Sequence, residues 1–135
     1  MPPLPRPTRV FGALALGWMA LILWLSTRTG GQLRGWLAWL PPYITDLSPG
    51  HIALFGVLAL WVGLALLPLR LSRPYLWAWV LVVAFGALDE WVQLGVPGRS
   101  LSLTDWLFDA SGAALALYLL YRYRREKATS RPKPL

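Results

Sequence analysis

The feature that most constrains this chain is a series of four long apolar runs that carry almost no charge. They cover residues 10–25, 52–69, 75–88 and 106–123, and the last of them contains Asp109 and, next to its end, Arg122. A helix needs roughly twenty such residues to cross the hydrocarbon core of a bilayer. With their flanks the runs reach that length. The sequence therefore predicts transmembrane helices at about residues 9–27, 51–69, 74–94 and 104–123.

The composition favours the same class of protein. Hydrophobic residues make up 56% of the 135 residues and charged residues 14%, against roughly 45–50% and 25% in soluble domains. A soluble body of this size cannot bury so much apolar surface. We therefore expect an all-α polytopic membrane protein, a four-transmembrane-helix bundle in which residues 1–135 form one membrane domain. The lipid bilayer is its predicted partner.

A short amphipathic segment, residues 31–40, lies between the first two spans. Its apolar residues recur at i, i+3, i+4 and i+7: Leu33, Trp36, Leu37 and Leu40. Polar residues interrupt the run, and Pro41 and Pro42 end it. This pattern predicts a short helix lying on the membrane surface rather than a fifth span.

The basic residues predict the orientation. If the amino terminus is inside, ten of the thirteen Lys and Arg residues fall in inner segments, and only Arg28, Arg34 and Arg99 fall in outer loops. This positive-inside bias places both termini in the cytoplasm, with a basic tail at residues 124–135. Because the basic cluster adjoins a span and contains no binding motif, anionic lipid headgroups explain the net charge of +7, and we expect no nucleic-acid partner.

With this topology the polar residues that are unusual in spans converge on the outer face of the membrane. These residues are His51, Asp89, Glu90, Gln93, Arg99, Asp105 and Asp109, and they include four of the six acidic residues of the chain. An acid at mid-bilayer costs roughly 2.5–3.5 kcal/mol on insertion scales, so such groups are usually paired, hydrated or functional. The chain has no cysteine and one histidine, which excludes thiol chemistry and a zinc site built on several imidazoles.

Helical spacing groups these residues into stripes. Asp89 and Gln93 are four residues apart and share a face, as do Asp105 and Asp109. Small residues continue both stripes, at Gly86 on the third span and at Gly112 and Ala116 on the fourth. We expect these two spans to approach closely there, so that their acidic faces meet around Arg99, whose guanidinium binds carboxylate or phosphate.

Other interpretations of the same residues stay open. His51 does not share the helical phase of the small residues on its own span, so its distance from the acids is undecided. Ser102 and Asp105 match a capping box at the start of the fourth span. Asp89 or Glu90 can equally pair with Arg99 to hold the loop in place.

The polar pattern resembles the VanZ-like family of small bacterial membrane proteins. The resemblance rests on His51, on the stretch Asp89-Glu90-Trp-Val-Gln93-Leu-Gly-Val-Pro97-Gly98-Arg99-Ser100, and on Asp105-Trp-Leu-Phe-Asp109-Ala-Ser-Gly112. The family pattern is similar: a His that opens a span, an Asp-Glu-x-x-Gln followed by Pro-Gly-Arg, and an Asp four residues before an Asp or Asn. Gly95 departs from it, because Phe or an equivalent is common there. The resemblance implies a link to reduced susceptibility to the glycopeptide antibiotic teicoplanin, without a defined biochemical activity.

These observations lead to one main functional interpretation. The outward site binds or processes a polar, lipid-linked or phosphorylated envelope molecule, and Arg99 holds its anion. The catalytic candidates are His51, Asp89, Glu90, Gln93, Asp105 and Asp109. The candidate cofactor is a divalent cation on Asp89, Glu90, Asp105 and Asp109.

Two alternatives remain at this point. The cluster of acids with Arg99 can be a structural ion-pair network in a non-enzymatic protein that modulates the envelope. The protein can also be a small transporter or assembly subunit. The sequence leaves the substrate, the oligomeric state and turnover itself open.

Overall fold

The computed structural model describes residues 3–39, 41 and 47–130, and the regular structure within these ranges is entirely helical. Four long helices make up most of it: α1 (Arg6–Ser26), α4 (Leu47–Leu66), α5 (Pro74–Gln93) and α6 (Leu103–Thr129). A short helix, α2 (Gly30–Trp36), follows α1, and a 3-10 turn, η1 (Leu67–Leu69), follows α4. Each long helix carries an apolar stretch long enough to cross a membrane. The predicted fold class and the four predicted spans are therefore confirmed.

The last helix is longer than the sequence indicated. α6 continues to Thr129, so the first residues of the predicted basic tail (124–135) are helical, while 131–135 lie outside the described residues. Side chains one turn apart stabilise this extension. Arg122 pairs with Glu126 at 3.1 Å, and Lys127 Nζ donates a hydrogen bond to the Tyr123 hydroxyl at 3.3 Å.

The helix between the first two spans is present but shorter than predicted. It covers Gly30–Trp36 instead of residues 31–40, and Leu40 lies outside the described residues. A capping box fixes its start: Thr29 Oγ1 accepts a hydrogen bond from the Gln32 backbone N–H, and the Gln32 side chain accepts one from the Thr29 N–H. These bonds satisfy two donors that a helix start otherwise leaves free.

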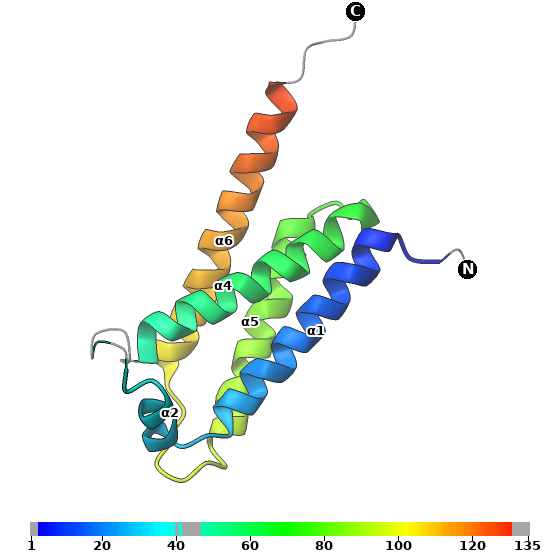
Figure 1. Ribbon diagram of the computed structural model, residues 1–135. Helices are drawn as coiled ribbons and strands as arrows, with labels where there is room; N and C mark the ends of the chain where they lie inside the picture. Colours follow the sequence, from blue (N-terminus) through cyan, green and yellow to red (C-terminus); the bar gives the residue numbers. More distant parts are fainter. Residues whose placement is uncertain (1–2, 40, 42–46, 131–135) are drawn as a thin grey trace, which may run out of the picture.

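The connections divide the molecule into two ends (Figure 1). One end holds α2, the last turn of α1, the first turn of α6 and the α5–α6 loop. The start of α1 and the α4–α5 connection lie at the opposite end, and the last turns of α6 project beyond them. Every candidate site residue belongs to the first end. Most of the basic residues belong to the second end, where they lie at the start of α1, in the α4–α5 connection and in the last turns of α6.

α4 is the central helix and packs against α1, α5 and α6. Its side chains Phe55, Leu58, Ala59 and Val62 form the middle of the buried core. Indole N–H groups add hydrogen bonds between helices by donating to backbone carbonyls: Trp18 to Leu54 (2.9 Å), Trp79 to Ala110 (3.0 Å) and Trp106 to Val83 (3.1 Å). Because lipid supplies no such partners, these bonds satisfy donors that would otherwise be costly.

The helices α6 and α4 pack closely against each other at two glycines. A Cβ atom added to Gly112 would clash with the backbone of Ile52, at 2.8 Å from its Cα, and one added to Gly56 would lie 3.4 Å from the Gly112 carbonyl oxygen. The expectation that Gly112 and Ala116 pack the fourth span against the third is therefore wrong. The helical phase explains the difference, because a different face of α6, with Trp106 and Ala110, contacts α5.

This approach also determines where two polar side chains lie. Gly112 follows Asp109 by about one helical turn, and Ile52 directly follows His51. Residues three apart share a helix face, so the contact of Gly112 with Ile52 brings Asp109 and His51 opposite each other. The packing of α4 on α6 thus positions the site described below.

We predict that Gly112→Ala lowers the stability of the protein. The added methyl group forces the backbones of α4 and α6 apart, and overpacking of this kind costs about 1–3 kcal/mol. Thermal unfolding of the purified protein checks this. Gly12→Ala on α1 is the control, because no atom lies within 4 Å of a Cβ added there. Equal melting temperatures for Gly112→Ala and the unsubstituted protein would contradict the described packing.

Candidate functional site

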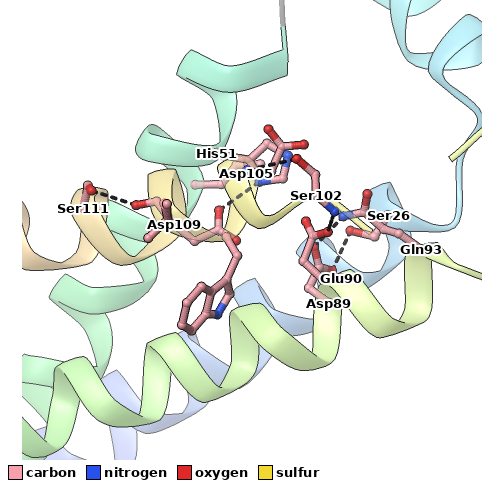
Figure 2. Close-up of polar contacts among 12 residues, drawn as sticks. Ser26, His51, Asp89, Glu90, Gln93, Ser102, Asp105, Asp109 and Ser111 are labelled. Carbon is pink, nitrogen blue, oxygen red and sulfur yellow. Dashed lines mark hydrogen bonds and ion pairs between the residues drawn. The ribbon is translucent and has the colours of Figure 1, made fainter. Parts of the chain in front are cut away.

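Buried and partly buried polar side chains from all four spans meet at one end of the bundle (Figure 2). Asp109 is fully buried, and Asp89, Glu90 and Gln93 are each at most 3% exposed. Ser26, at the end of α1, is also buried. Such a concentration of buried polar groups is costly unless the groups satisfy one another. The contacts among them therefore define the site.

The first contact joins His51 of α4 to Asp109 of α6. Nδ1 of His51 lies 2.8 Å from Oδ1 of Asp109, and the imidazole stacks on Phe55 with ring centroids 6.3 Å apart. A carboxylate on Nδ1 fixes the orientation of the ring and leaves Nε2 as its free atom. The sequence left the position of His51 undecided. The structure places it directly against one of the acids.

The second oxygen of Asp109 has no partner among the described residues, although it is buried. Gly86 of α5 makes room for it, because a Cβ atom there would lie 3.2 Å from Oδ2 and 3.3 Å from Cδ1 of Trp106. Asp109 is thus enclosed by α4, α5 and its own helix, and its hydrogen bond from the described residues comes from His51.

A second group of contacts runs from α1 through α5 to the loop. The Ser26 hydroxyl donates to Oδ1 of Asp89 at 2.6 Å, and Nε2 of Gln93 donates to Oδ2 at 3.0 Å. Oε1 of Gln93 in turn accepts from a terminal nitrogen of Arg99 at 2.8 Å. Asp89 and Gln93, which were predicted to share a helix face, therefore contact each other directly. The sequence did not identify Ser26 as a site residue, because a serine commonly follows the last apolar residue of a transmembrane helix without any further role.

Arg99 does not occupy the position that the sequence predicted. Instead of joining the acidic faces, it bonds the neutral amide of Gln93, and its buried Nε has no partner among the described residues. Among the described residues, ion pairs link His51 to Asp109 and Arg122 to Glu126. The expectation that the acids meet around Arg99 is wrong, since the loop carries the guanidinium to the side of Gln93.

Glu90 and Asp105 lie at the junction of α5 and α6. Oε2 of Glu90 accepts from the backbone N–H of Ser102 at 2.6 Å, and the Ser102 hydroxyl accepts from the Asp105 N–H at 3.1 Å. Half of the expected capping box is therefore present: Ser102 caps the helix, but Glu90 rather than Asp105 takes the Ser102 N–H. Both bonds hold the start of α6 in place.

The structure does not gather the acids into a metal centre. Within the described ranges, no group of three or more His, Asp or Glu side chains could hold a metal ion. The carboxylates are divided among separate donors: Asp89 with Ser26 and Gln93, Glu90 with Ser102, and Asp109 with His51. The four acids predicted to bind a divalent cation, Asp89, Glu90, Asp105 and Asp109, are thus not brought to one point.

A cavity of about 230 Å³ opens beside these contacts. Its polar lining includes members of both contact groups: Ser26, His51, Asp89, Gln93 and Arg99. Its apolar lining comes from α1, α4, α2 and the residue that follows α2: Ile22, Leu25, Leu33, Trp36, Leu37, Leu54 and Phe55. The arrangement offers an acid–base side chain and a cationic side chain to one partly open, largely apolar cavity.

Comparison with known proteins gives one result that bears on this site. The sequence matches the VanZ/LLP1 family over residues 11–124, which includes all the residues that form the two contact groups. No curated protein and no solved structure matches the chain. Because the match covers most of the 135 residues, this membrane protein belongs to the VanZ/LLP1 family.

Proposed function

We propose that this protein binds the polar or phosphorylated head group of a cell-envelope molecule, and that His51 exchanges a proton with it. The observation that carries the proposal is the His51–Asp109 contact, at 2.8 Å, beside a cavity that Arg99 also lines. A carboxylate–imidazole pair is suited to moving a proton, and a guanidinium is suited to holding an anion.

The proposed orientation places the site on the outer face of a bacterial inner membrane. The site lies at the end of the bundle that contains α2 and the α5–α6 loop, and most of the basic residues belong to the opposite end. Positive charge favours the cytoplasmic side, which puts both termini in the cytoplasm. The molecules that the site can reach are then those of the outer leaflet and the cell envelope.

Arg99 is the proposed anion contact. One of its terminal nitrogens is held by Gln93, which is held in turn by Asp89. A guanidinium fixed in this way can offer its remaining N–H groups without losing much side-chain freedom on binding. Its Nε is buried and has no partner within the described part of the chain, which supports the idea that a ligand completes its hydrogen bonds.

His51 is the proposed proton carrier. Asp109 occupies Nδ1, so the reactive position is Nε2, which makes no hydrogen bond with the described residues. Asp109 stabilises the charged imidazole that forms when Nε2 takes a proton. Asp89, Glu90 and Gln93 are positioning residues in this proposal. Asp89 holds Ser26, Glu90 holds Ser102, and Gln93 holds Arg99.

A specific observation also favours the structural alternative. The chain of bonds Ser26–Asp89–Gln93–Arg99 and the bond from Ser102 to Glu90 join three helices and the loop. A protein that used them for stability alone would have no need of an anion in the cavity. The link of the family resemblance to teicoplanin susceptibility fits either case, and the measurements below separate the two.

The orientation predicts the outcome of topology reporters. An alkaline phosphatase domain inserted in the outer loop near residue 97 should be active, because that enzyme works only outside the cytoplasm. The same domain fused after residue 130 should be inactive. The reverse pattern would place the site in the cytoplasm and remove the envelope proposal.

We predict that Arg99→Ala weakens the binding of inorganic phosphate to the purified protein at least tenfold. A hydrogen bond to a charged group contributes about 1.5–3 kcal/mol, or roughly tenfold or more in affinity. Phosphorus NMR line broadening measures the binding. Arg34→Ala is the matched control, since Arg34 lies at the same end of the molecule but is exposed and outside the cavity lining.

Two readouts complete this test. In cells where the protein lowers teicoplanin susceptibility, Arg99→Ala should abolish that effect while Arg34→Ala retains it. If the unsubstituted protein binds no phosphate and Arg99→Ala only lowers the melting temperature, the structural alternative is correct and the binding proposal fails.

A further inference from the structure

The cavity has two chemically different parts that lie at different depths. The polar side chains Ser26 and His51 come from the outer ends of α1 and α4, and Arg99 comes from the loop beyond α5. The apolar side chains Ile22 and Phe55 come from deeper turns of the same two helices. At 1.5 Å per residue, Ile22 lies about 6 Å further from the outer end of α1 than Ser26 does.

This order matches the arrangement of a lipid in a bilayer. A lipid keeps its polar head at the surface and directs its chain toward the middle. Here the groups suited to a charged head lie at the outer end, and the apolar lining continues inward between α1 and α4. A freely soluble anion would gain nothing from that inner part.

The third wall of the cavity faces the membrane surface. It comes from α2 and the residue after it, through Leu33, Trp36 and Leu37. Trp36 stacks on Trp24 of α1 with ring centroids 5.5 Å apart, and both indoles are about half exposed. Tryptophan is typical of the membrane–water interface. These contacts hold the short helix against α1 at the depth where lipid head groups lie.

The volume limits what can enter. At about 230 Å³ the cavity is smaller than the roughly 300–1,000 Å³ of most small-molecule sites. It can take a small head group and the first part of one chain, while the rest of the molecule stays in the bilayer. A whole envelope precursor with a large head group would not fit inside.

We infer that the occupant of this cavity is an amphiphile of the outer leaflet, a lipid whose small head group is a terminal phosphate monoester and which enters from the side of the bilayer. The phosphate lies against Arg99 and His51, and the first part of the chain lies between Ile22 and Phe55. This inference rests on the proposed head-group site and adds the class of ligand and its route. Free phosphate is the rival source of the same chemistry.

The test compares two probes on the full-length protein in phosphatidylcholine nanodiscs. Dodecyl phosphate supplies a head and a chain, whereas inorganic phosphate supplies the head alone. Each buried methylene contributes roughly a fourfold gain in affinity, so a few buried methylenes should make dodecyl phosphate bind at least tenfold more tightly. Radiolabelled dodecyl phosphate, corrected for its uptake by empty nanodiscs, measures the binding.

A pair of glycine substitutions makes the test specific for the cavity. Gly50→Leu adds a side chain at the cavity lining, and Gly17→Leu adds one on α1 away from it. No atom lies within 4 Å of a Cβ added at either position, so both variants should fold. We expect Gly50→Leu to weaken dodecyl phosphate binding at least tenfold and Gly17→Leu to change it less than twofold.

The outcomes separate this inference from the head-group site. If both probes bind equally well and Arg99→Ala weakens both, the head-group site stands and the lipid inference is overturned. Equal losses for Gly50→Leu and Gly17→Leu would also overturn it. If neither probe binds, or if Arg99→Ala leaves both affinities unchanged, the proposed function fails and this inference fails with it.

Discussion

The contact between His51 and Asp109 is the interaction on which the rest of this structure depends. It joins α4 to α6 at the end of the bundle where the spans meet the membrane surface, and it supplies a partner to a fully buried carboxylate. A buried charge without a partner is strongly destabilising. The contact exists because Gly112 lets the two helix backbones approach at Ile52, directly beside His51. The close packing of α4 on α6 therefore also creates the contact between His51 and Asp109.

The same end of the bundle combines rigidity with an open space. Ser26, Asp89, Gln93 and Arg99 form a line of hydrogen bonds from α1 to the loop, and Glu90 holds the start of α6. These bonds fix the polar side of the cavity, while apolar residues of α1, α2 and α4 form its other side. Preorganised polar groups beside apolar walls suit a ligand with a charged head and an apolar chain.

Hydrophobic run length alone was enough to predict the four spans, because the bilayer imposes one length on every crossing helix. Helical spacing was enough for Asp89 with Gln93, which contact each other within one helix. It failed where partners are far apart in sequence. Spacing could not pair His51 with Asp109 or Ser26 with Asp89, and it assigned Gly112 to the wrong neighbour. Such contacts depend on helix rotation, which single-sequence patterns leave undetermined.

The most direct test uses the fact that the chain has one histidine. In protein purified without a histidine tag and labelled with nitrogen-15 histidine, the two ring nitrogens give signals from His51 alone. The account predicts that the neutral ring carries its proton on Nδ1, in a hydrogen bond to Asp109, and that Asp109→Asn shifts this signal. Spectra that stay the same in Asp109→Asn would contradict the contact and with it the proposed site.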